Sequence, residues 1–100
     1  EYRTLARDDG WLSNAFERET VTISVHEDVR NDERGYYEAC EAIFKKYQGR
    51  PHWGKVHYAQ SSDFIASYPR WLDWWRLRNT FDPAGCFLND FLSSVSPKGL

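Results

Sequence analysis

The chain has 100 residues, enough for one domain with a modest core, because a domain of this size buries only about two-thirds of its unfolded surface. Thirteen basic and fifteen acidic side chains give a net charge of −2, which supplies no general attraction for nucleic acid or for an anionic membrane. Aromatic residues make up 17% of the chain, more large apolar surface than a small domain readily hides. Part of that surface is therefore expected to face a partner domain or a ligand.

Cysteine content and hydropathy bear on the redox state of the chain and on its cellular location. Cys40 and Cys86 lie far apart in the sequence, so reduced, buried thiols are expected rather than a disulfide scaffold. No apolar run approaches the length of a membrane span and no signal-like segment opens the chain, which favours a cytoplasmic location. Methionine is absent and residue 1 already belongs to a predicted strand, so we expect further sequence upstream.

Two strands are predicted in the N-terminal part. Residues 1–5 alternate so that Glu1 and Arg3 share one face of a strand. Residues 6–18 have no sustained period and are predicted to be a long loop. Residues 19–29 form the clearest strand.

The second predicted strand has two different faces. Its apolar face, expected to point at a core, consists of Val21, Ile23 and Val25. Its other face consists of Thr22, Ser24 and His26, which suits hydrogen bonding to a polyol but is also common on half-exposed strands. Two strands alone are marginal in water, so the sheet is expected to be completed outside this chain or by self-association with a second copy.

Helices are predicted after the strands. Asn31 or Asp32 can cap a helix that runs to about residue 48, acts as scaffold and ends at Gly49. A short strand at 56–59 and a helical turn capped by Ser61 or Ser62 follow.

The C-terminal part is predicted to be helical as well. A helix of residues 70–80 starts after Pro69 and carries three tryptophans, which favours packing between two layers over stacking on a sugar. Residues 82–85 form a turn with proline second and glycine fourth, and residues 87–95 form a last amphipathic segment. The elements together predict an α+β fold, with a few antiparallel strands packed with helices.

The segment 50–57, Arg-Pro-His-Trp-Gly-Lys-Val-His, combines costly residue types without a helix or strand period. Pro51 bars a helix at the preceding residue, and Gly54 permits close approach to the backbone. Two imidazoles, an indole and an ammonium can stack on a planar ring and donate to oxygen anions. A solvated connection anchored by Trp53 explains the same residues equally well.

This segment resembles the signature of flavin-dependent sugar-lactone oxidases, the L-gulonolactone and D-arabinonolactone oxidases with their dehydrogenase relatives, and of the alditol or xylitol oxidases. Further matches are Glu1-Tyr2-Arg3, Asp8-Asp9-Gly10-Trp11-Leu12-Ser13, Tyr68-Pro69, Asp82-Pro83-Ala84-Gly85 and Phe87-Leu88-Asn89. The resemblance covers nearly the whole chain. It implies that residues 1–100 are a single domain, the C-terminal piece of a larger substrate (cap) domain, from which the flavin-binding domain is absent.

The resemblance also implies roles for individual residues. Glu1 and Arg3 match the Glu-x-Arg pair that contacts substrate beside the flavin, and Lys55 matches a lysine next to both substrate and flavin. Ser24 and His26 match strand positions at the substrate, where relatives vary. His52 is a candidate to hydrogen-bond FAD or substrate, although a structural role explains it equally well.

The implied activity is hydride transfer from a carbinol carbon of a sugar lactone or polyol to FAD, which the absent domain would mainly bind. The implied partner is that flavin-binding domain of the parent chain. The alternative is an aromatic-rich binding or assembly module without catalysis. No phosphate-binding glycine motif, nucleophile elbow or metal-ligand spacing is present, so the sequence supports neither a nucleotide cradle, a hydrolase nor a metal site.

Overall fold

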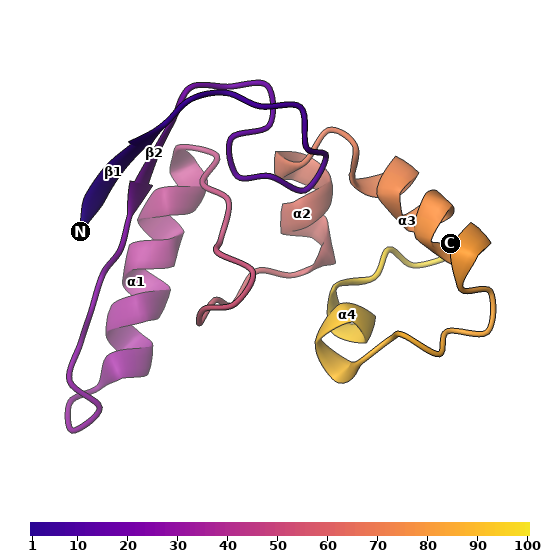
Figure 1. Ribbon diagram of the computed structural model, residues 1–100. Helices are drawn as coiled ribbons and strands as arrows, with labels where there is room; N and C mark the ends of the chain where they lie inside the picture. The colour runs from indigo at the N-terminus through magenta and orange to yellow at the C-terminus, as the bar shows by residue number, and fades with distance from the viewer. The chain divides into compact units, whose positions relative to one another are not determined.

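The computed structural model describes all residues from 1 to 100 and contains two strands and four helices (Figure 1). Contacts group the chain into two compact units, Glu1–Tyr58 and Ala59–Leu100. The first unit contains both strands and one helix, and the second contains the other helices. The α+β class is confirmed. The single domain predicted for residues 1–100 stays a prediction, and each unit is described by itself.

β1 (Tyr2–Leu5) and β2 (Thr20–Ile23) form an antiparallel hairpin in which Arg3 pairs with Thr22. The ladder continues by one pair, because the main-chain nitrogens of Glu1 and Ser24 each donate to the other residue's carbonyl oxygen at 2.8 Å. Directly opposed residues share a face of a sheet. The register therefore places Glu1, Arg3, Thr22 and Ser24 on one polar face.

The apolar face of this hairpin is open to solvent. Val21 and Ile23 are 44% and 53% exposed, so the prediction that they face a core is wrong within this chain. The reason is that α1, the helix of this unit, packs on neither strand. The buried residues of the unit are instead Ala15 and Phe16, in the connection between the strands.

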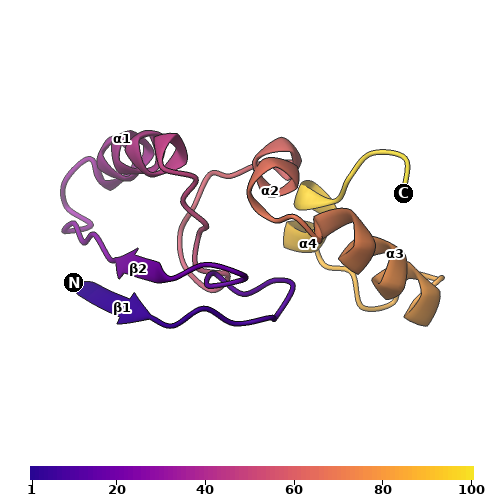
Figure 2. The same cartoon turned by 90° about the horizontal axis from the view of Figure 1, so that it is seen from above.

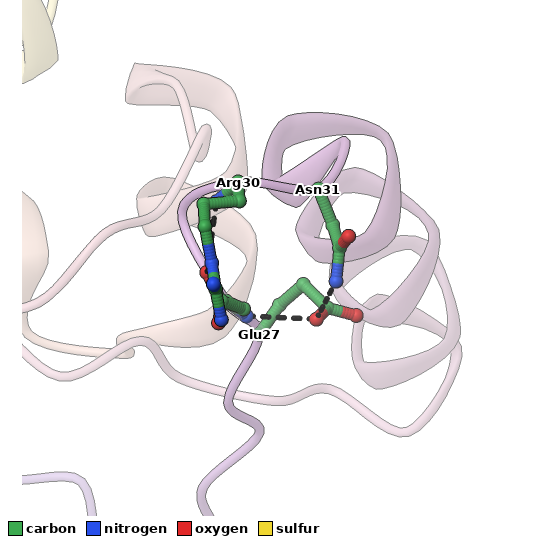
Figure 3. Close-up of polar contacts among 4 residues, drawn as sticks. Glu27, Arg30 and Asn31 are labelled. Carbon is green, nitrogen blue, oxygen red and sulfur yellow. Dashed lines mark hydrogen bonds and ion pairs between the residues drawn. The ribbon is translucent and has the colours of Figure 1, made fainter.

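α1 (Glu33–Lys46) begins where its sequence predicts. The Asp32 side chain accepts from the Gly35 nitrogen at 3.1 Å and so satisfies one of the unpaired amides of the first turn. The connection from β2 is a local polar network in which Glu27 accepts from Asn31 at 2.8 Å (Figure 3). Beside it, the Arg30 side chain donates to the carboxylate of the nearby Asp28.

The second unit is built from α2 (Ser61–Ser67), α3 (Trp71–Phe81) and α4 (Asp90–Val95), with α2 contacting both other helices. Its core is aromatic and consists of Phe64, Tyr68, Trp71 and Trp75, each at most 2% exposed, together with Val95. Packing is therefore confirmed as the role of Trp71 and Trp75, whereas the second layer predicted to cover this helix stays a prediction.

Three predicted elements differ from the structure. The strand predicted at 19–29 extends only over Thr20–Ile23, so His26 lies outside it. The short strand predicted at 56–59 is wrong, because the Tyr58 nitrogen donates to the Glu41 carboxylate at 2.7 Å instead of joining a sheet. The last helix begins at Asp90 rather than 87, where the Asn89 side chain caps it by accepting from the Leu92 nitrogen at 2.8 Å.

Both cysteines are free thiols, as predicted. Cys40 is half-buried, whereas Cys86 is exposed, so the predicted burial of Cys86 is wrong. Cys86 follows Gly85 in the turn after α3, and its main chain rather than its side chain is held there. No helix is long and apolar enough to cross a membrane.

Asp82 holds the turn after α3. Its carboxylate accepts from the nitrogens of Phe87 at 3.0 Å and Cys86 at 2.8 Å, and it pairs with the guanidinium of Arg78. The hydrogen bond from the Phe87 amide is the largest cause that lowers the pKa of Asp82 below its ordinary value, followed by that from Cys86 and the charge of Arg78. Asp82 therefore stabilises the folded state when its side chain is ionised.

Replacing Asp82 by asparagine should lower the thermal midpoint of the second unit by several degrees at neutral pH, because two main-chain amides and the Arg78 guanidinium lose a charged acceptor. Since the folded-state pKa is depressed, the stabilisation is present above the unfolded value of about 3.9 and is lost as the pH falls through the lower folded value. Thermal unfolding followed by circular dichroism, repeated from about pH 2 to about pH 7, measures both effects. The control is Asp73→Asn, a half-exposed carboxylate that pairs with Arg70 and Arg76 but with no main-chain amide, and an equal shift in it would contradict the assignment.

Candidate functional site

Glu1 and Arg3 form an ion pair on the polar face of the hairpin. Arg3 Nε donates to Glu1 Oε1 at 2.8 Å, and Nη2 contacts the same oxygen. This hydrogen bond and the charge of Arg3 lower the pKa of the Glu1 carboxyl, with a smaller contribution from His26 in the same direction. Glu1 is therefore an ionised acceptor at neutral pH.

The contacts between Glu1 and Arg3 use only part of the hydrogen-bonding capacity of the two side chains. Both contacts fall on Oε1 of Glu1, which leaves Oε2 available to accept a hydrogen bond. The remaining N–H groups of the Arg3 fork are likewise available, and the Arg3 side chain is 68% exposed. The arrangement can bind a ligand that carries a hydroxyl donor and a neighbouring oxygen acceptor.

Ser24 and His26 lie next to this pair. Ser24 is bonded to Glu1 through the main chain, and its side chain is exposed on the same face. His26 is close enough for its charge to act on Glu1. The structure thus brings together Glu1, Arg3 and Ser24 at the end of the hairpin, with His26, which lies beyond β2, near enough to influence the Glu1 carboxyl.

His52 and Lys55 lie in a separate turn after α1. The Lys55 nitrogen donates to the His52 carbonyl at 3.1 Å, and the Gly54 nitrogen donates to His52 Nδ1 at 3.0 Å. Because Nδ1 accepts, a neutral His52 carries its proton on Nε2, so the outer edge of the ring is a donor. Both side chains are exposed, and Lys55 forms no ion pair.

No hydrogen bond or ion pair joins Lys55 or His52 to Glu1 or Arg3. The segment that carries the turn runs back against the connection between the two strands (Figure 2). That connection leaves β1 at Leu5, the opposite end of the ladder from Glu1. The convergence of the two halves of the site stays a prediction.

Two residues of the 50–57 segment serve the fold of the unit. The anchoring role of Trp53, one of the two explanations drawn from the sequence, is confirmed, whereas that of Arg50 was not predicted. Arg50 Nη1 donates to the carbonyl oxygens of Ser13, Asn14 and Phe16 at 3.3, 3.1 and 3.1 Å. Trp53 Nε1 donates to the Leu12 carbonyl at 2.9 Å. The large indole of Trp53 was the sequence signal for an anchor, whereas Arg50 had only its placement among residues predicted to bind a ligand.

The predicted site residues line neither of two surface hollows in the structure. One hollow, in the first unit, is lined by Glu38, Glu41, Ala42, Lys45 and Tyr58. Beside it, burial lowers the pKa of the half-buried His57, an effect partly offset by the charge of Glu41. The other hollow lies wholly within the second unit. The hairpin face is therefore an open surface.

Comparison with known proteins places the chain. Residues 1–95 match the family model described as D-arabinono-1,4-lactone oxidase. The chain is 40% identical over 95 residues to L-gulono-1,4-lactone dehydrogenase of Mycobacterium tuberculosis and 36% identical over 99 residues to L-gulonolactone oxidase of Mus musculus. It is also 37% identical over 100 residues to an alditol oxidase of a Streptomyces species.

These relatives are named as oxidases and dehydrogenases, so the family to which they point is one of oxidoreductases. The chain belongs to the D-arabinono-1,4-lactone oxidase family, and the resemblance stated from its motifs is confirmed. The matches cover 95% of this chain but only 22–23% of each relative's length. The activity of the whole protein is therefore a matter for proposal.

Proposed function

We propose that this chain is the C-terminal substrate-binding and catalytic part of an FAD-dependent oxidoreductase that oxidises a hydroxyl group of a sugar lactone or an alditol. The observation that carries the proposal is the Glu1–Arg3 pair, which keeps a carboxylate oxygen and guanidinium N–H groups open on one polar face. Family membership supports the reaction class.

The pair suits the oxygen-rich substrates named in the relatives. Glu1 Oε2 accepts a hydrogen bond from a substrate hydroxyl and orients it, while Glu1 Oε1 holds the Arg3 fork in place. Arg3 then donates to the substrate oxygen on which negative charge develops during oxidation. Ser24 and His26 supply further hydrogen bonds along the substrate from the same strand end.

Lys55 and His52 fit the edge of a flavin ring by the chemistry of their donors. A flavin edge presents oxygen and nitrogen acceptors, and the structure leaves the Lys55 ammonium and the Nε2 donor of His52 exposed. When bound, FAD supplies the acceptor for the hydride. Lys55 contributes a positive charge that balances the negative charge gained there. The segment resembling the flavin-oxidase signature supports this assignment.

The partner in this proposal is the flavin-binding domain of the parent chain. The exposed apolar side chains of Tyr2, Val21 and Ile23 on the hairpin, and of Ile43 on α1, support burial against further polypeptide. A cytoplasmic location is part of the same proposal. The alternative, an assembly module without catalysis, explains these apolar side chains but not the open Glu1–Arg3 pair.

The full-length parent protein tests the proposal directly. Purified with its bound chromophore, it should lose the absorbance of oxidised flavin under anaerobic conditions when a sugar lactone or an alditol is added. A panel of both substrate kinds, with a simple aliphatic alcohol as control, separates the two classes. No bleaching with any sugar lactone or alditol would overturn the proposal.

A further inference from the structure

The connection between the two strands, residues 6–19, is held by hydrogen bonds within itself. We call this segment the platform. The Asp8 carboxylate accepts from Ser13 Oγ at 2.6 Å and from the Gly10 nitrogen at 3.1 Å. The Asp8 main chain is tied across the loop to Ala15 at 3.1 Å, and Ala15 is 2% exposed. Carbonyl oxygens of this connection are thereby fixed in direction.

Arg50 and Trp53, which follow α1 in the sequence, bind to that platform. The Arg50 guanidinium donates to the carbonyl oxygens of three platform residues. The Trp53 indole N–H donates to a fourth carbonyl oxygen, that of Leu12. A cation on neutral carbonyl oxygens makes charge-assisted hydrogen bonds, which are stronger than neutral ones. The segment 50–53 is therefore held at two points more than thirty residues away in sequence.

The turn that carries Lys55 follows directly from these anchors. Only Gly54 lies between Trp53 and Lys55, and the turn is closed by the bonds within residues 52–55. Two residues of chain span at most about 7 Å, so the Lys55 backbone has little freedom once Trp53 is fixed. The side chains alternate in use: Arg50 and Trp53 bind the platform, whereas His52 and Lys55 stay exposed.

We infer that Arg50 and Trp53 are positioning residues that set Lys55 relative to the strands carrying Arg3, by anchoring its turn to the connection between those strands. The inference rests on the proposed function for the role of Lys55. The physical link runs from Lys55 through Trp53 and Arg50 to the platform, and from the platform directly into β1 and β2.

A double-mutant cycle in the full-length holoprotein tests the inference. Arg50→Gln should lower the rate of substrate oxidation about 10- to 100-fold, because small misplacements of a positioned group have effects of that order. In the Lys55→Ala background the same substitution should change the rate less than about twofold, since the group it positions is gone. Trp53→Phe, which keeps an aromatic ring but removes the N–H donor, should show the same pattern with a smaller factor.

A second readout does not depend on activity. Hydrogen exchange of the Lys55 amide, which donates to the His52 carbonyl, should become at least about 10-fold faster in Arg50→Gln, because the turn opens more often. Arg30→Gln, which removes an exposed arginine that pairs only with the nearby Asp28, is the matched control and should change neither exchange nor rate. If Arg50→Gln does not fold, Trp53→Phe serves for both readouts.

The outcomes separate the inference from the function on which it rests. If Lys55→Ala leaves the oxidation rate unchanged, the proposed role of Lys55 is wrong. If Lys55→Ala is slow but the Arg50 and Trp53 substitutions cost the same factor in both backgrounds, these residues act only through stability, and the positioning inference is overturned. Unchanged amide exchange at Lys55 would overturn it as well.

Discussion

Replacing Arg3 by alanine in the full-length protein should lower kcat for substrate oxidation by about 10²- to 10³-fold, the usual effect of removing one donor aimed at developing negative charge. The substitution removes the N–H groups that the Glu1 pair leaves open, and it leaves the Glu1 carboxylate without its cation. Steady-state kinetics with the best substrate of the panel measure the loss.

Two further variants make this result specific. Arg3→Lys should recover little of the rate, because a lysine ammonium cannot reproduce the planar fork that Glu1 orients. Arg7→Ala removes another exposed arginine, just beyond β1, and should leave the rate within about twofold. A kcat for Arg3→Ala within that same margin would contradict the role assigned to Arg3.

Replacing Trp71 by alanine should unfold the second unit, at a cost of about 3–5 kcal/mol for a buried tryptophan. Trp71 is 1% exposed and stacks on Phe64 with ring centroids 4.9 Å apart, and it meets Trp75 edge-on at 5.8 Å. Such a loss is a large fraction of the roughly 5–15 kcal/mol that stabilises a whole domain.

Near-ultraviolet circular dichroism of the aromatic cluster is the appropriate measurement for Trp71→Ala, because it reports fixed ring packing. Trp71→Phe keeps a ring in the core and should retain much of the signal. Phe81, at the end of the same helix, is 81% exposed, so Phe81→Ala should change the unfolding free energy by less than about 0.5 kcal/mol. A folded, fully cooperative Trp71→Ala variant would show that the core lies elsewhere.

Local sequence patterns predicted the elements that local interactions determine. Asp32 predicted the start of α1 because a side-chain cap needs only a residue three positions away. The alternation of residues 1–5 and 20–23 likewise predicted one polar face, and the register of Arg3 opposite Thr22 confirms it. The remainder of the strand predicted at 19–29 is wrong, because β2 ends at Ile23. Packing was correctly predicted for Trp71 and Trp75 of α3, which are buried, whereas Trp74 is half-buried and a second layer over this helix stays a prediction.

Long-range contacts were beyond such patterns. Nothing in the sequence near Arg50 indicates that its partners are three carbonyl oxygens of residues 13–16, since every residue carries a carbonyl oxygen. The strand predicted at 56–59 failed for a related reason, because a side chain of α1, Glu41, took the Tyr58 amide that a sheet would need.

The site was predicted mainly through its resemblance to a family. Alternation alone placed Glu1 and Arg3 on one face but gave them no role, and a solvated ion pair on a strand has the same pattern. The structure adds which atoms stay open: Oε2 of Glu1, part of the Arg3 fork, and the outer edge of His52.

The most direct test of the account is a crystal structure of the full-length protein with FAD and a bound sugar lactone or alditol. We expect the Arg3 guanidinium and Glu1 Oε2 to lie within about 3.2 Å of substrate oxygens, with the Lys55 ammonium across the same cavity, in hydrogen-bond contact with substrate or flavin. A substrate bound elsewhere, with Arg3 and Lys55 on separate surfaces and no cavity between them, would contradict the central claim.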